Sequence, residues 1–283
     1  MRNRILAGLG VAALATVGLA TPATALSSTT ADIWVVHAFP DVEVDVYING
    51  DLALDSFMPG DVEPLVDVAA GNYVVDIVPS VDPAAPTITE GTGLFGTGPA
   101  GADIAAGTSY SLVAHPLVGG APTLAAFVND LTPAAPGQAS VTVRHTADAP
   151  AVDVVALPNT PLFSGVTNGQ QGKTTVAAAT YDLQVQLDGA DPQVVAIDLP
   201  NTALAAGTHY FIHAFGPNAE DAFSVVIFTI ADTPSGVPAG SAGLVAENSS
   251  STTALIAGGV ALLALLAVAG VVVARRQAAP AGR

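Results

Sequence analysis

The nine residues 181–189 read Tyr-Asp-Leu-Gln-Val-Gln-Leu-Asp-Gly. Apolar and polar side chains alternate over the first seven positions, and a strand places alternate side chains on opposite faces. This pattern predicts a β-strand with one buried face. The alternation returns 108 residues earlier, at Tyr73, Val75 and Ile77. The Asp-Gly pair that ends the stretch, like Asn49-Gly50, predicts a tight hairpin turn, because these residues tolerate the positive φ angles of such turns.

An internal repeat runs through the middle of the chain. Its first part is offset by 108 residues and its last part by 100, so the first copy carries eight extra residues. We place these residues in a surface loop over 79–101, where Pro and Gly are frequent. The matched pairs are 33–37 with 141–145, 44–46 with 152–154, and 105–110 with 205–210.

Turn signals recur in each copy at roughly 8–12 residues, the spacing expected for sandwich folds. We therefore predict an all-β chain with two tandem antiparallel β-sandwiches, Ig-like or transthyretin-like, over 32–132 and 139–232. Pro133 to Gln138 joins them, and we expect this short proline-containing segment to be a semi-rigid spacer.

The opening motif of each copy resembles a known family. Residues 37–50 read His-Ala-Phe-Pro-Asp-Val-Glu-Val-Asp-Val-Tyr-Ile-Asn-Gly, which is similar to the DUF4397 family of bacterial extracellular domains. Residues 145–153, His-Thr-Ala-Asp-Ala-Pro-Ala-Val-Asp, resemble it too, although Ala156-Leu157-Pro158 replaces the Tyr-Ile-Asn-Gly turn. The resemblance covers nearly all of 32–232. It implies two tandem copies of a surface β-sandwich and no established activity.

The N-terminus has the three parts of a secretory signal. Arg2 and Arg4 precede an apolar stretch that begins at Ile5, and Ala-Thr-Ala at 23–25 is a small-x-small cleavage site. We predict a signal peptide over 1–25, cleaved after Ala25. An uncleaved anchor helix is the alternative.

The C-terminal part contains 21 uncharged, mostly apolar residues at 254–274. A helix of this length spans about 31 Å, which matches the hydrocarbon core of a bilayer. Arg275 and Arg276 follow, and positive residues stay in the cytoplasm. We expect a transmembrane helix at 254–274, a cytoplasmic tail at 275–283 and a flexible stalk at 233–253. This predicts a single-pass plasma-membrane protein with its body outside the cell.

Sortase anchoring is the alternative for this end of the chain. Leu-Pro-Asn-Thr occurs at 157–160 and at 199–202, but neither run is followed by Gly and neither lies close to the apolar segment. We interpret both runs as strand-to-turn junctions.

The middle of the chain is strongly acidic. Between Asp32 and Glu247 there are 24 acidic residues and two basic ones, Arg144 and Lys173, a net charge of −22. Such a surface repels nucleic acid, so we expect no nucleic-acid partner. It fits an extracellular protein kept dispersed, or one that attracts cations. The chain has no Cys, which excludes disulfides, thiolate metal sites and a Cys nucleophile.

Asp41, Glu43 and Asp45 are the candidate metal ligands. They alternate on a segment that runs from a loop into a strand, so the three carboxylates are expected to point the same way. Ca²⁺ prefers several carboxylate oxygens, and we consider a calcium site here. The alternative is that these carboxylates only face solvent. No other cofactor is expected.

The histidines and the single Trp have simpler interpretations. His37 and His145 are equivalent in the two copies and each precedes a turn, so we expect each to hydrogen-bond its loop backbone. His209 and His213 are about 13 Å apart along a strand, too far to share one Zn²⁺. Trp34 lies in an apolar run and is expected in a core; a sugar-binding platform is the alternative.

Motifs for catalysis are missing from the sequence. It has no Gly-x-Ser-x-Gly elbow, no P-loop and no dinucleotide-binding fingerprint. We expect a non-enzymatic surface protein that binds an envelope component or a protein partner, or serves as a spacer. Its ligand surface is expected at the 37–45 segment and the 79–101 loop. A calcium-stabilised adhesion module and an extracellular hydrolase are the alternatives; the hydrolase requires a pocket that joins a His, a carboxylate and a hydroxyl.

Overall fold

A computed structural model describes residues 27–81, 83–191, 193–217 and 222–232. Within these ranges the chain is all-β, as predicted, with eighteen strands and no helix. The predicted signal peptide with its cleavage site at Ala25, the stalk, the transmembrane helix and the tail lie outside the described residues. Among the described residues no helix is long and apolar enough to cross a membrane.

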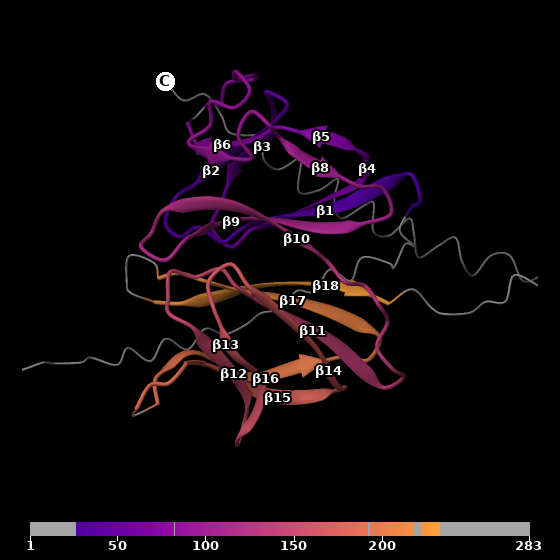
Figure 1. Ribbon diagram of the computed structural model, residues 1–283, viewed down its shortest axis with the longest axis vertical. Helices are drawn as coiled ribbons and strands as arrows, with labels where there is room; N and C mark the ends of the chain where they lie inside the picture. Colours follow the sequence, from indigo (N-terminus) through magenta and orange to yellow (C-terminus); the bar gives the residue numbers. More distant parts are fainter. Residues whose placement is uncertain (1–26, 82, 192, 218–221, 233–283) are drawn as a thin grey trace, which may run out of the picture. The chain divides into compact units, whose positions relative to one another are not determined.

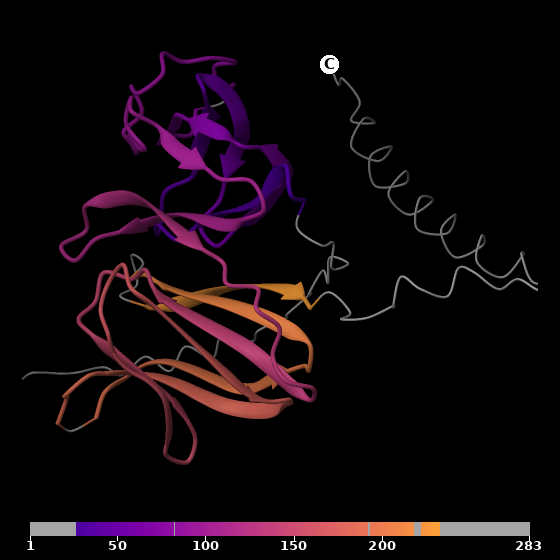
Figure 2. The ribbon, with the colours of Figure 1, turned by 45° about the vertical axis from the view of Figure 1, so that its right-hand side comes forward.

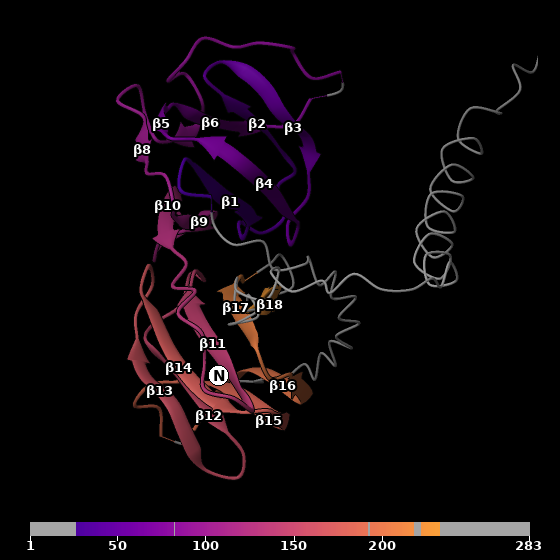
Figure 3. The same ribbon diagram turned by 90° about the vertical axis from the view of Figure 1, so that its right-hand side faces the viewer.

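The first repeat folds as two four-stranded sheets and a short ribbon (Figure 1). The strands of one sheet are, in spatial order, β10 (Pro122–Val128), β9 (Ser109–Pro116), β1 (Thr30–His37) and β4 (Val62–Ala69). The strands of the other are β3 (Asp51–Phe57), β2 (Val44–Ile48), β6 (Val75–Pro79) and β7 (Phe95–Gly96). The ribbon pairs β5 (Gly71–Tyr73) with β8 (Ala102–Ile104). Figure 3 shows β2 and β3 in one layer and β1 and β4 in the next.

The second repeat has the same strand order in its two sheets. One sheet contains β14 (Gln171–Ala177), β11 (Gln138–His145), β17 (Thr208–Phe215) and β18 (Ser224–Ala231). The other contains β13 (Thr160–Val166), β12 (Val152–Ala156), β15 (Ala179–Leu187) and β16 (Val195–Leu204). In the second repeat, the continuous strand β16 occupies the place of two short strands of the first repeat, β7 and β8. Those two strands are separated by residues 97–101, which belong to the longer loop of the first repeat.

The sheets are mixed, which corrects the predicted purely antiparallel sandwiches. β1 pairs with β9 in parallel, and β11 pairs with β17 in parallel. These strands contain runs such as Ile33 to Val36 that are buried on both faces. Two-sided burial is the setting in which parallel strand pairs occur.

A separate core lies between the two sheets of each repeat. Alternate residues of β1 and β9, such as Val35 and Leu112, pack on the second sheet of the first repeat. In the second repeat, Leu183 and Val185 of β15 are buried, whereas Asp182 is exposed. The alternation over 181–187 therefore forms the half-buried strand that was predicted.

The turn at Asn49-Gly50 is the predicted tight hairpin between β2 and β3. Both residues have positive φ, 51° and 80°. A Cβ atom on Gly50 would also lie 2.8 Å from the carbonyl oxygen of Ile88, so only glycine fits. The prediction for Asp188-Gly189 was wrong in part, because this pair only begins a longer connection between β15 and β16. Of the two Leu-Pro-Asn-Thr runs, 157–160 forms the turn between β12 and β13, whereas 199–202 lies inside β16.

Candidate functional site at the junction of the two repeats

The outer faces of two sheets meet where the repeats join. The β1–β9 sheet packs against the β11–β17 sheet (Figures 1 and 2), and both repeats belong to one compact unit. The Trp34 ring stacks on Phe228 with centroids 4.5 Å apart and planes 9° from parallel. The predicted spacer therefore joins repeats that are in contact, because each has an apolar outer face. The buried cluster contains Trp34, Val36, Ala38, Val113, Phe127, Phe211, Val226 and Phe228.

Arg144, on β11, is the polar centre of this junction. Its side chain is fully buried. Nη1 donates to Ser111 Oγ at 2.8 Å, and Nη2 donates to Asn129 Oδ1 at 2.7 Å, both in the first repeat. Nε donates to Gln171 Oε1 at 3.0 Å in its own repeat. Ser111 Oγ in turn donates to Asn129 Oδ1 at 2.9 Å, so the acceptors form one network.

Two aromatic rings enclose the Arg144 guanidinium. Its central carbon lies 4.8 Å from the Phe127 centroid and 5.1 Å from that of Phe211, which gives a cation–π contact from each repeat. Among the described residues its partners are neutral. Burial lowers the pKa of Arg144 to about 9, so the group still carries its charge at neutral pH. A charge removed from water is costly unless it is fully hydrogen-bonded, so the junction depends on this network staying intact.

His213 completes the network from β17. Its Nε2 lies 3.0 Å from Arg144 Nη1. Because a guanidinium can only donate, Nε2 must accept and the proton must be on Nδ1. That Nδ1 is buried. Burial, followed by the Arg144 charge, holds the pKa of His213 well below its usual range, which keeps the imidazole neutral.

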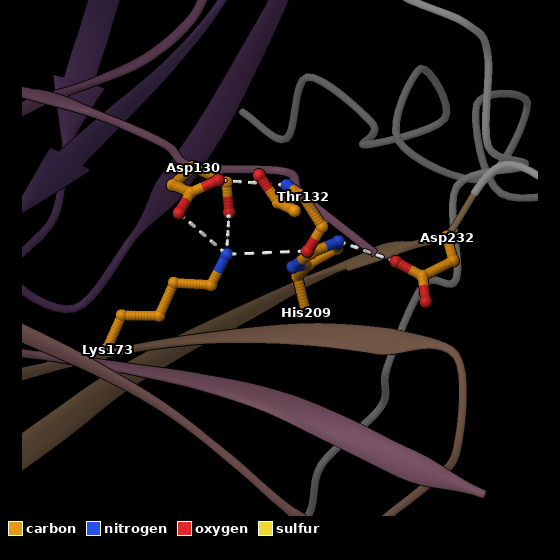
Figure 4. A network of polar contacts seen from close by, with 5 residues as sticks. All are labelled: Asp130, Thr132, Lys173, His209 and Asp232. Atoms are coloured by element: carbon orange, nitrogen blue, oxygen red, sulfur yellow. Dashed lines mark hydrogen bonds and ion pairs between the residues drawn. The ribbon is translucent and has the colours of Figure 1, made fainter. Parts of the chain in front are cut away.

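An ion pair and a histidine–carboxylate contact lie at one edge of the junction (Figure 4). Lys173 Nζ contacts Asp130 Oδ2 at 2.9 Å and donates to the Asp130 carbonyl oxygen at 2.9 Å, which ties the second repeat to the end of the first. Hydrogen bonds from Thr132 and Lys173 hold the pKa of Asp130 well below its usual range. Beside them, His209 Nε2 lies 2.6 Å from Asp232 Oδ1.

The opposite edge is closed by the turn between β9 and β10. Asp148 Oδ1 of the second repeat accepts the Gly119 amide at 2.8 Å. Asn168 Nδ2 donates to the Pro116 carbonyl at 2.9 Å and to the Ala147 carbonyl at 2.7 Å. The repeats are therefore in contact at both edges and at the centre of the junction.

The structure does not gather the acidic residues that were considered as calcium ligands. Asp45 is buried, and its carboxylate accepts the Ser56 amide at 3.0 Å. Asp41 and Glu43 are exposed on the loop before β2. Among the described residues no three carboxylate or histidine side chains converge on a common point for a metal.

Asp45 has a structural role that recurs in the second repeat. Ser56, whose amide it accepts, has a φ of 55° where the β2–β3 pairing is irregular. Asp153 Oδ1 accepts the amide of Gly165, which has a φ of 62° at the corresponding irregularity of β12–β13. The repeated Val-Asp-Val motif therefore positions a carboxylate that holds a bulge in the neighbouring strand.

The interpretations of His37 and His145 are confirmed. His37 Nε2 bonds to the Val42 carbonyl and His145 Nε2 to the Pro150 carbonyl, both at 2.8 Å. His209 and His213 have separate partners, Asp232 and Arg144. Trp34 is buried as expected, but in the junction and not in the core of its own repeat.

Ser140, His209 and Asp232 provide a hydroxyl, an imidazole and a carboxylate close together. Ser140 is paired with His209 across β11 and β17. Both are buried, and neither Ser140 Oγ nor His209 Nδ1 has a hydrogen-bond partner among the described residues. Cavities of about 50 Å³ and about 20 Å³ lie inside the two sandwiches and do not include any of the three residues.

The two loops expected to form a ligand surface are adjacent. The Ser80 amide donates to the Glu43 carbonyl at 2.9 Å, and the Phe39 and Phe95 rings are 6.2 Å apart. Asp76 holds the long loop in place by accepting the Gly91 and Gly93 amides, each at 2.8 Å. The loop presents two apolar side chains, Val81 and Leu94, which are 62% and 65% exposed.

The sequence interpretation missed the junction. From the sequence, Arg144 is only one of two basic residues between Asp32 and Glu247, whereas in the structure the repeats join around it. Its place in the strand 138–145, where Thr142 and Arg144 interrupt an apolar run, was the available signal. A polar residue at the centre of a strand that is otherwise buried on both faces needs partners from elsewhere in the molecule.

Comparison with known proteins adds one match. A family model, described as a domain of unknown function (DUF4397), matches residues 31–155. The match covers the first repeat and extends through β11 into β12 of the second, so it supports the resemblance noted for the first opening motif. No curated protein matches the chain.

Proposed function

We propose that the chain is a membrane-anchored bacterial cell-surface protein whose two repeats, both of the DUF4397 kind, form one rigid, non-catalytic head that binds a positively charged component of the cell envelope. The family match and the shared strand order support the relationship between the repeats. The secretory-type N-terminus and the apolar run at 254–274 support the location.

The observation that carries the proposed binding is the absence of a free cation on the described part of the head. Arg144 and Lys173 are the only basic residues between Asp32 and Glu247. Arg144 is fully buried, and Lys173 is paired with Asp130. The exposed charges of this surface are carboxylates. A partner that binds it through charge must therefore carry positive charge.

The loop end of the first repeat is the place on the head that best fits such a partner. Asp41 and Glu43 are exposed there beside the long loop, which presents Val81 and Leu94. Apolar side chains bordered by charge are typical of protein interaction sites. A partner with basic and apolar side chains would match both features.

The experiment is co-sedimentation of the 26–247 ectodomain with its own cell-envelope fraction, at low and at high salt. We expect saturable binding that weakens as salt rises, because screening reduces attraction between exposed charges. The variant Asp41→Asn with Glu43→Gln should lower the affinity. The matched control, Asp188→Asn with Asp191→Asn, removes the same charge from exposed loops of the second repeat and should change it less.

Three other results would each change the proposal. Equal losses in the two variants would indicate a general acidic field and no particular site. Binding that is lost with chelator would favour a calcium-stabilised adhesion module. No binding under any condition would favour a spacer, the role to which the rigid junction is also suited.

A further inference from the structure

The junction is made from equivalent faces of the two repeats. β1 and β9 of the first repeat correspond to β11 and β17 of the second, and the outer face of each pair is the one that is buried. An interface that uses the same face on both partners closes after two units, because neither partner has that face left for a third. These repeats therefore form a closed pair and not one segment of a longer stack.

The equivalent faces carry different residues at the centre. Arg144 and His213 of the second repeat stand where the first repeat has Val36 and Val113. The acceptor Asn129 of the first repeat has a counterpart in Ile230. The donor, Arg144, belongs to the second repeat, whereas two of its acceptors, Ser111 and Asn129, belong to the first.

This division of donors and acceptors opposes pairing between like repeats. Two second repeats would face Arg144 with Phe211 and Ile230, the counterparts of Ser111 and Asn129, and the buried cation would lose both acceptors. Two first repeats would bury Asn129 without the Arg144 donor, and its Oδ1 would keep only the hydrogen bond from Ser111 of its own repeat. Unpaired buried polar groups are a strong form of discrimination between partners.

We infer that the junction is a selective recognition surface on which a first repeat pairs with a second repeat and not with its own kind, so that two copies of this chain can join by exchanging their second repeats. The partner for this surface is thus another molecule of the same protein. The contacts made between chains would be those now made within one chain. This inference does not depend on the proposed envelope binding.

The first test uses the whole ectodomain with a protease site inserted into the linker at 134–136. After cleavage we expect the two fragments to co-elute. When two differently tagged cleaved samples are mixed, tagged first repeats should acquire untagged second repeats. Fragments that separate while each keeps its β-sheet circular dichroism, or first repeats that capture first repeats equally well, would overturn the inference.

The second test keeps the chain intact and does not depend on the fragments staying folded. Arg144→Val and Asn129→Ile each copy the residue at the equivalent position of the other repeat. We expect each single change to lower the melting temperature and, in the cleaved protein, to raise the exchange rate by about tenfold to a hundredfold. The double variant should melt above the temperature expected from adding the two shifts, because it removes donor and acceptor together. Simple additivity would overturn the selectivity.

Discussion

Arg144 and His213 are in direct contact, and charging both would cost much more free energy than charging Arg144 alone. The imidazole accepts from the guanidinium at 3.0 Å, and both side chains are fully buried. Protonation of His213 would remove this acceptor and place a second positive charge beside the first. At the scale of single residues, the junction is therefore stable only while this histidine is neutral.

We predict that the head loses stability as the pH falls from about 7 to about 5. Burial lowers the pKa of every histidine in the chain, His37, His115, His145, His209 and His213, below the ordinary value of 6.5. The unfolded chain then binds protons that the folded chain does not, so stability is complete above 6.5 and declines below it. Each histidine contributes a slope of at most about 1.4 kcal/mol per pH unit.

Urea unfolding across this pH range provides the measurement. His213→Asn should flatten the profile, because it removes one of the groups that protonate only after unfolding. A free energy of unfolding that stays constant down to about pH 5 would contradict the prediction.

Asp45 distinguishes a structural carboxylate from a calcium ligand. Asp45→Leu removes the buried carboxylate that accepts the Ser56 amide, and we predict a loss of about 1–3 kcal/mol. Asp41→Asn, at an exposed position, should be nearly neutral. Melting of the wild-type ectodomain with and without chelator completes the comparison. A wild type that melts lower with chelator, together with a harmless Asp45→Leu, would support a calcium site and contradict the structural role of Asp45.

At the scale of elements, the two bulges offer a test within one molecule. Ser56 has a positive φ that costs a non-glycine residue about 1–2 kcal/mol, whereas the equivalent Gly165 adopts its φ freely. We therefore predict that Ser56→Gly raises the melting temperature and that Gly165→Ser lowers it. Thermal unfolding of both variants checks the signs. Shifts of the same sign would show that these positions are not equivalent.

An element could be predicted from the sequence when the residues that determine its structure lie close to it in the chain. β15 was predicted from alternation alone, since one of its faces meets the core of its own repeat. In β1 and β11 the consecutive apolar residues indicate two-sided burial, but nothing nearby in the chain shows what covers the second face. The parallel pairing of β1 with β9 joins distant segments and has no local signal. The Asn49-Gly50 turn depended on two residues and was predicted, whereas the hydrogen-bond partners of Arg144 come from four other strands or strand ends.

For the whole molecule, the proposed topology makes a simple prediction. Protease added outside intact protoplasts should remove the head, because the segment 26–253 is expected to lie outside the membrane. Immunoblots for the head and for a tag at the C-terminus measure the two sides separately. The head should disappear while the tag stays attached to a short protected fragment. Full protection of the head would contradict the topology.

The single Trp of the chain reports on the junction. Trp34 stacks on Phe228 of the other repeat, so its fluorescence follows the contact between repeats, whereas far-ultraviolet circular dichroism follows the sheets. If the junction makes the head one cooperative unit, the two signals should change at the same denaturant concentration in the wild type. In Arg144→Ala, the loss of the central network should move the Trp34 transition to lower denaturant while the sheets persist. A Trp34 transition that precedes the loss of sheet already in the wild type would mean that the repeats are joined by their linker and only weakly by the junction.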